Sequence, residues 1–277
     1  MDYYISGDSI TNQISTLHVF SLGYYKKYIQ SFIPNNKLIL DTNINEKDTP
    51  LIFITKIESL DNFYNKIIPS LNNKFILITH YGDGKAGVHD KILNHPLLIK
   101  WYGQNMSIIS DKTSGIPIGL ENRYWKHTDI SVIKKHSNNS KESLLYLNFS
   151  LKTNPQRGKI MKNLLQKGFH KNNQLPWADY IKDLSTHKFC ISPNGNGVDC
   201  HRTWEALYLD VIPIVEKSIE MSYFNDLRIL FVDSYDDISI DYLNQIYNDF
   251  QHKSFNMDKL SISYWERKIK EEFNQTN

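Results

Sequence analysis

The chain has 277 residues, of which 40% are hydrophobic and 22% are charged. At roughly 150 residues per domain, this length predicts about two domains that fold without disulfide bonds or structural metals. The 32 basic and 30 acidic side chains leave a net charge of +2. That balance is too even for a protein held to nucleic acid through phosphate contacts, so no nucleic-acid partner is expected.

The cysteines and the apolar runs indicate the compartment. Cys190 and Cys200 are the only cysteines, and two of them make no disulfide framework, which favours a reducing environment. A cleaved secretory signal begins with a basic segment followed by an apolar one, and residues 1–8 show no such pattern. No apolar run approaches the roughly 20 residues of a membrane helix. We therefore expect a cytoplasmic protein with no integral membrane segment.

In the first half, continuous apolar runs alternate with segments whose apolar residues recur at helical spacing. Residues 37–41 are a short apolar run that ends in a carboxylate, and residues 51–57 and 74–80 are apolar runs typical of strands buried on both faces. Residues 62–68 have apolar side chains at helical spacing, with Ser59 as a candidate cap. A strand, a helix and a strand in this order predict a βαβ unit and a parallel sheet.

An uninterrupted polar run at 134–143 (KKHSNNSKES) predicts a linker between two domains; the alternative is a long surface loop. We place an N-terminal α/β domain over 1–138 and a C-terminal α/β domain over 139–277. The second domain repeats the same alternation, with predicted strands at 144–149, 188–192, 211–215 and 229–232, helices at 157–165, 177–184 and 200–209, and a mostly helical end at 238–273.

The segment 189–215 (FCISPNGNGVDCHRTWEALYLDVIPIV) combines a buried strand, a glycine loop and a helix with a polar start. Parallel sheets bind ligands beyond the carboxyl ends of their strands, where this loop lies. Gly195 and Gly197 would let the backbone approach a phosphate, and the N–H groups of the helix start favour an anion. Asp199 is placed to cap the helix. The segment predicts a binding site for a phosphate-containing ligand.

The helix after this loop carries polar side chains in its first turns. His201 and Arg202 add donors beside the phosphate position, and an arginine can hold two oxygens at once. Glu205 lies three residues after Arg202, on the same face. Because most of the helix is apolar, we expect this pair to face a ligand, with Glu205 accepting from two ribose hydroxyls. The alternative is a surface ion pair.

A second interpretation uses the same glycines. Gly195-x-Gly197-x-x-Cys200 nearly matches the dinucleotide-binding fingerprint, with Glu216 about 20 residues further on. However, Cys200 replaces the third glycine, and the motif falls late in the chain. An NAD(P)-dependent oxidoreductase is therefore the weaker alternative.

The run SPNGNGVDCHRTWEALYLDVIPIV resembles the C-terminal motif of exostosin-like glycosyltransferases. In that family, a strand ending in Ser/Cys-Pro precedes a glycine-containing loop, an arginine and a glutamate three residues apart, and a strand with a proline. The matching positions here are Ser192-Pro193, Gly195, Gly197, Arg202, Glu205-Ala206-Leu207 and Ile212-Pro213-Ile214; residues 80–125, Asn148-Phe-Ser and Asn154-Pro-Gln-Arg157 are more distantly similar.

The resemblance implies a GT-B architecture, in which two Rossmann-like domains with parallel sheets face each other across a cleft. The C-terminal domain would bind a nucleotide-sugar, usually a UDP-sugar, with Glu205 on the ribose and Arg202 and Arg157 on the diphosphate. Neither a metal nor another cofactor is implied, and no Asp-x-Asp occurs at a strand end. The predicted donor-binding residues are Arg157, Ser192, Asn194, Gly195, Asn196, Gly197, Asp199, His201, Arg202 and Glu205.

An inverting sugar transfer also needs a base that takes a proton from the acceptor hydroxyl. The loop 80–85 (HYGDGK) follows a buried strand and so lies at the ligand edge of the first sheet. Asp83 is the preferred base and His80 the second; the alternative is that Asp83-Gly84 only forms a turn. Weaker candidates are Asp8, Asp41, His89 and Asp90.

Aromatic residues are abundant at 13%, and they cluster near the end of the first half. Trp101, Tyr102, Tyr124 and Trp125 are expected either in the core or at an acceptor subsite, and Tyr264-Trp265 is expected to anchor a closing helix on the first domain. The sequence thus predicts a glycosyltransferase acting on a nucleotide-sugar and a glycan hydroxyl. The alternatives are the oxidoreductase and a nucleotide-sugar-binding module without catalysis.

Overall fold

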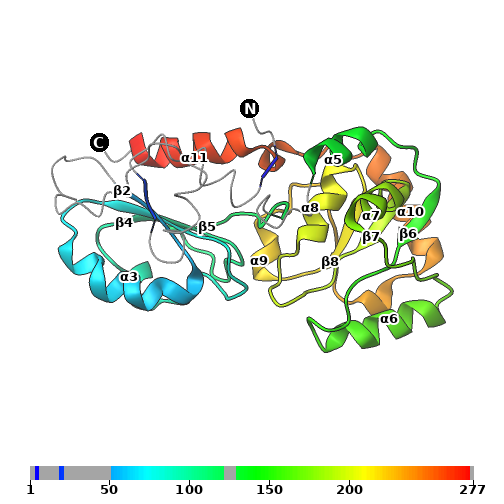
Figure 1. Cartoon of the computed structure of the whole chain (residues 1–277), viewed down its shortest axis with the longest axis horizontal. Helices are drawn as coiled ribbons and strands as arrows, with labels where there is room; N and C mark the ends of the chain where they lie inside the picture. Colours follow the sequence, from blue (N-terminus) through cyan, green and yellow to red (C-terminus); the bar gives the residue numbers. More distant parts are fainter. Residues whose placement is uncertain (1–3, 6–18, 22–50, 122–128, 275–277) are drawn as a thin grey trace.

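The computed structural model describes residues 4–5, 19–21, 51–121 and 129–274. Two parallel sheets lie along the long axis of the molecule, one in each half of the chain (Figure 1). The short apolar run at 37–41 lies outside the described residues. Within the described part of the chain, no helix is long and apolar enough to cross a membrane.

The first sheet has five parallel strands, which follow each other in chain order. They are β1 (Val19–Ser21), β2 (Leu51–Thr55), β3 (Phe75–Thr79), β4 (Leu98–Gly103) and β5 (Thr113–Gly115). Helix α3 (Leu60–Lys66) joins β2 to β3, which confirms the predicted βαβ unit. Ser59 occupies the N-cap position without a capping hydrogen bond, because a 3-10 turn at Ile57–Ser59 leads into the helix.

Alternate residues of β2 and β3 face two different layers. On one face, Phe53 and Phe75 pack against Phe63 of α3, with ring centroids 5.0 to 5.9 Å apart. The isoleucines of the other face belong to a core cluster that also includes Trp265 and residues of the second half. Burial on both faces explains why these strands are continuous apolar runs.

The second sheet has four parallel strands, again in chain order. They are β6 (Ser143–Tyr146), β7 (His187–Ile191), β8 (Ile212–Glu216) and β9 (Leu230–Val232). The connecting segments contain α6 (Gln156–Gln166), α7 (Trp177–Leu184), α8 (His201–Tyr208) and α9 (Ile219–Ser222), and α10 (Ile240–Gln251) follows β9. These elements match the alternation predicted for the second half.

The polar run between the halves is more ordered than a linker. Its first residues, 134–136, are the last turn of α5 (Ile130–His136), which packs against α7. Lys141 Nζ donates to the carbonyls of Ser185 and Leu209, both at 2.7 Å. The first three residues of the run are thus helical, and Lys141 holds the following part to the second half; the domain boundary placed within this run stays a prediction.

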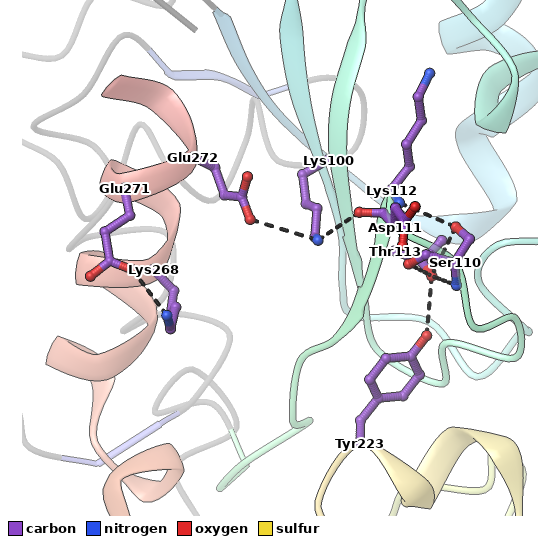
Figure 2. Close-up of polar contacts among 9 residues, drawn as sticks. All are labelled: Lys100, Ser110, Asp111, Lys112, Thr113, Tyr223, Lys268, Glu271 and Glu272. Atoms are coloured by element: carbon purple, nitrogen blue, oxygen red, sulfur yellow. Dashed lines mark hydrogen bonds and ion pairs between the residues drawn. The ribbon is translucent and has the colours of Figure 1, made fainter. Parts of the chain in front are cut away.

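Helix α11 (Ile262–Asn274) returns from the second half and lies along the first sheet (Figure 1). Trp265 is 2% exposed and meets the Tyr102 ring edge-on, with centroids 6.5 Å apart. Near the end of the helix, Glu272 lies 3.6 Å from Lys100 of β4 (Figure 2). These contacts confirm that the Tyr264-Trp265 segment anchors a closing helix on the first half, and they place Tyr102 in the core.

The carboxyl edges of the two sheets face each other. Asn105 follows β4 and contacts Asp199, which follows β7. Tyr223, beyond β8, reaches the Thr113 hydroxyl of β5 at 3.1 Å (Figure 2). In neither described sheet does the strand order reverse, unlike a doubly wound Rossmann sheet. The loops available to a ligand therefore come from the junction of the two halves.

We expect Trp265→Ala to lower the free energy of unfolding by about 3–5 kcal/mol, as other buried tryptophan truncations do. Lys268→Ala, on an exposed part of the same helix, should change it by less than about 0.5 kcal/mol. Urea denaturation of both variants measures the difference. Equal stabilities would contradict the anchoring of α11 through Trp265.

Candidate functional site

The two glycine loops predicted as ligand sites contact each other. Asn105, 3% exposed, donates through Nδ2 to the Asp83 carbonyl at 3.4 Å and accepts at Oδ1 from the Asp199 N–H at 2.8 Å. A Cβ on Gly197 would lie 2.8 Å from Asn105 Nδ2 and 3.2 Å from the Asp83 carbonyl. Gly197 therefore permits the close approach of the two halves.

Three of the predicted site residues hold one stretch of backbone, residues 117–119. His80 Nε2 lies 3.0 Å from its first carbonyl, Asp199 Oδ2 accepts from its middle N–H at 2.6 Å, and His201 Nδ1 lies 2.7 Å from its last carbonyl. Because His80 comes from the first half and the other two from the second, this stretch is fixed from both sides.

His80 is buried with one ring nitrogen unused. Its Nε2 faces a carbonyl, which can only accept, so the proton lies on Nε2 and Nδ1 carries the lone pair. Nδ1 is enclosed and has no hydrogen-bond partner within the described part of the chain. Burial lowers the pKa of His80 to about 4, partly opposed by the Pro117 carbonyl and aided by nearby His201. The ring is therefore neutral at pH 7.

Asp199 connects the halves rather than capping a helix. Helix α8 begins after Cys200, one residue later, and that N-cap makes no side-chain hydrogen bond. The Asp199 carboxylate accepts from the Ile118 N–H and from Trp204 Nε1, each at 2.6 Å. Burial raises the pKa of Asp199 to about 7, although these hydrogen bonds favour the charged form. The capping role predicted for Asp199 is wrong, because its oxygens are used at the junction.

Glu205 lies inside the second half, only 6% exposed. Its Oε1 accepts from Trp177 Nε1 at 3.0 Å, and its Oε2 accepts from the Tyr180 hydroxyl at 2.8 Å. Burial excludes the alternative of a surface ion pair. A carboxylate has about four acceptor positions, so two remain after these contacts.

Arg202 is the strongest sign of an anionic ligand. Its Nε is enclosed and has no hydrogen-bond partner among the residues that the structure describes. Burial by itself lowers the pKa of the guanidinium, but Tyr180, Cys190 and Glu205 outweigh it, so the net pKa is raised. A buried donor left unpaired costs about 1–3 kcal/mol, and more for a charged group, so such groups normally have a partner.

Arg157 supports the glycine loop from within. Its guanidinium donates to the carbonyls of Ser150, Pro193 and Asn194 at 2.7 to 3.0 Å. A Cβ on Gly195 would lie 3.1 Å from Arg157 Nη2, so Gly195 makes room for this arginine. These contacts give Arg157 a bracing function that the sequence did not indicate.

Of the remaining loop residues, Ser192 is buried and its hydroxyl lies 2.8 Å from the Thr203 hydroxyl. The Asn194 side chain is half-buried, and Asn196 is exposed. Ser192 thus joins the loop to α8, and Asn196 is accessible to a ligand.

The Asp83 side chain is exposed at the junction. Its carboxylate makes no hydrogen bond or ion pair that involves the described residues, while its backbone carbonyl is held by Asn105. Among the weaker candidates for the base, His89 caps the short helix α4 (Asp90–Leu93), and Asp8 and Asp41 lie outside the described residues. Trp101 is fully buried, and Tyr124 and Trp125 also lie outside the described residues.

The sequence did not indicate Asn105, Trp177 or Tyr180 as site residues. Asn105 follows β4, which was not predicted because Lys100 interrupts its apolar pattern. Its left-handed backbone, with φ of 53°, is a conformation that asparagine tolerates. Trp177 and Tyr180 lie three apart on a predicted helix, but their common partner, Glu205, is distant in the chain.

Of the comparisons with known proteins, the one with solved structures gives a match. No protein-family model matches the chain, and we find no curated protein similar to it in sequence. The crystal structure of a glycosyltransferase from Rickettsia africae ESF-5 is similar with a TM-score of 0.50. The match covers 97% of this chain and 93% of that one, at 12% sequence identity. The whole chain, with both halves, therefore has a fold found in a glycosyltransferase.

Asp199 and His80 should give opposite pH dependences of stability. The pKa of Asp199 is raised from 3.8 to about 7 on folding, so its contribution is lost as pH rises between these values. The pKa of His80 is lowered from 6.5 to about 4, so its contribution is lost as pH falls between these values. Each slope is at most about 1.4 kcal/mol per pH unit.

We therefore expect the stability of Asp199→Asn, relative to the wild type, to rise as the pH rises from about 4 to about 7. That of His80→Gln should fall as the pH rises from about 4 to 6.5. Urea denaturation at a series of pH values measures both. Parallel profiles for Asp199→Asn and the wild type would show that this carboxyl is not perturbed by burial.

Proposed function

We propose that the protein is a glycosyltransferase that moves a sugar from a nucleotide-sugar to a glycan hydroxyl. The observation that carries this proposal is Arg202, a half-buried residue whose guanidinium Nε has no hydrogen-bond partner among the described residues, one turn before Glu205 on α8. Helix α8 follows the carboxyl end of β7, where parallel sheets bind ligands. The fold likeness to a glycosyltransferase is consistent with this assignment.

On the donor side, we assign Arg202 to the diphosphate and Glu205 to the ribose, with a UDP-sugar as the donor suggested by the exostosin-like motif. Trp177 and Tyr180 each donate to one Glu205 oxygen and so fix the orientation of the carboxylate. Arg157 would act by holding the loop in place, because its guanidinium already contacts three carbonyls. The facing carboxyl edges of the sheets are consistent with a GT-B arrangement.

The leaving diphosphate carries charge that the site must neutralise. We propose that Arg202 and the N-terminus of α8 supply this positive potential without a bound metal. Among the described residues, no group of three or more His, Cys, Asp or Glu side chains could hold a metal ion. In an inverting reaction, a base on the other side of the anomeric carbon then takes the proton from the acceptor hydroxyl.

Asp83 remains the preferred base over His80. The Asp83 side chain is exposed at the junction, so an acceptor can reach it. The free lone pair of His80 also suits a base, but Nδ1 is enclosed, and the pKa of His80, lowered to about 4 by burial, makes the ring a weak one. An efficient general base has a pKa near the working pH.

The oxidoreductase alternative fits the loop less well. In a dinucleotide fold, the glycines of the fingerprint admit the pyrophosphate and allow close packing of helix and strand. Here the Cβ positions of Gly195 and Gly197 are approached by Arg157 and Asn105 instead. The alternative of a non-catalytic nucleotide-sugar-binding module would share the donor site and differ in turnover.

We expect UDP, without added metal, to raise the melting temperature more than GDP or NADH does. Saturation at a hundred times the dissociation constant adds about 2.7 kcal/mol of stability. Arg202→Met should lose this response, since a hydrogen bond to a charged group contributes about 1.5–3 kcal/mol, or at least about tenfold in affinity. Without nucleotide, Arg202→Met should be less stable than the wild type, because it removes the positive charge that faces the buried Glu205 carboxylate.

The matched control is Arg267→Met, which removes a surface arginine of α11 and should leave the nucleotide response intact. If NADH raised the melting temperature and UDP did not, the protein would be the oxidoreductase of the alternative interpretation. If UDP raised the melting temperature of Arg202→Met as much as that of the wild type, Arg202 would not be part of the donor site.

A second pair of variants separates binding from chemistry. Asp83→Asn keeps the backbone contact with Asn105 but cannot accept a proton, so donor hydrolysis or sugar transfer should fall by about 10²–10⁴. UDP should still protect this variant normally. If His80→Gln alone loses turnover, the base is His80. Full turnover in both variants would place the acceptor elsewhere, and UDP binding without turnover in the wild type would favour the binding module.

A further inference from the structure

One segment of the chain has a net positive charge that exceeds that of the whole chain. Residues 143–178 contain no aspartate or glutamate. With the whole chain at +2, this segment leaves the rest of the chain at −4. The cations of the segment are Lys152, Arg157, Lys159, Lys162, Lys167 and Lys171.

Two of these cations are used internally. Arg157 is buried under the glycine loop, and Lys167 Nζ donates to the carbonyls of Asp236 and Ile238. The other four, Lys152, Lys159, Lys162 and Lys171, are exposed and make no ion pair or hydrogen bond through their ammonium groups within the described part of the chain. Helix α6, which carries two of them, lies at the outer edge of the second half (Figure 1).

Exposed leucines lie among these lysines. Leu151, Leu165 and Leu175 are 49%, 43% and 37% exposed, and they are three of the seven large exposed hydrophobic residues of the described chain. On α6, Lys159, Lys162 and Leu165 follow each other at steps of three and share one side of the helix.

The segments before and after α6, which carry the remaining lysines and leucines, are joined by hydrogen bonds. The Asn172 N–H donates to the Leu147 carbonyl at 2.9 Å, and Asn148 Nδ2 donates to the Asn173 carbonyl at 2.6 Å. We call the set Leu151, Lys152, Lys159, Lys162, Leu165, Lys171 and Leu175 the α6 surface.

We propose that the α6 surface docks on an anionic lipid bilayer. Its unpaired ammonium groups would approach lipid phosphates, while the lysine stems and the leucines would enter the apolar boundary below the headgroups. Nucleic acid fits less well, because the one arginine of the segment and its phenylalanines, Phe149 and Phe169, are buried. This interaction is independent of the proposed enzymatic function.

The test is co-sedimentation of the full chain with vesicles of phosphatidylcholine, with and without phosphatidylglycerol. We expect binding to the anionic vesicles only, weakened by salt because surface charges are screened. Replacing Lys152, Lys159, Lys162 and Lys171 by Gln should lower the partition coefficient by roughly fivefold per lysine. Leu151→Ser with Leu165→Ser should lower it further, including at high salt.

The matched control replaces Lys66, Lys74, Lys135 and Lys182, all exposed and outside the α6 surface, by Gln. It changes the net charge equally and should retain most of the binding. If both quadruple variants lost the same amount of vesicle binding, binding would depend on net charge alone, and the proposal would be overturned. So would an absence of vesicle binding, with or without binding of an RNA duplex in its place. Melting temperatures of all variants verify that they are folded.

Discussion

The buried carboxyl group of Asp199 is the contact on which the arrangement of the two halves depends. It accepts from the backbone of residue 118, which leads out of the first sheet, and from Trp204, in the helix after β7. Its own N–H donates to Asn105. A carboxyl group enclosed in this way resists ionisation, so its hydrogen bonds and its desolvation oppose each other. The junction is thus polar, specific and sensitive to substitution.

This junction explains how the glycine loops are used. Gly197 lacks a side chain because Asn105 and the Asp83 carbonyl approach it, and Gly195 lacks one because Arg157 does. The loops are thereby built before any ligand arrives, which lowers the entropic cost of forming a site. Arg202 is the exception, since its buried Nε lacks a partner. An unpaired donor among satisfied neighbours is the feature on which the proposed binding of an anionic ligand rests.

Glu205 illustrates the same preorganisation at a second position. Two donors from α7 fix its carboxylate, and both come from a helix that packs beside the end of the sheet. In the proposed function, donor binding would then be set by α7 and α8, both in the second half of the chain. The candidate base, by contrast, lies on a loop whose position depends on the junction. Binding and chemistry would then respond differently to changes at Asp199 or Asn105.

Local sequence determined β2 and β3 of the first half, the strands of the second half, the βαβ unit and the positions of the glycine loops, because burial on both faces leaves a continuous apolar run and tight turns require particular residues. It also placed Arg202 and Glu205 on one helix face, since three-residue spacing fixes that geometry. Only the tertiary structure decided that Asp199 joins two halves, that Arg157 braces a loop, and that Trp177 and Tyr180 hold Glu205. These contacts link residues far apart in the chain, and no local periodicity encodes which distant polar groups will pair.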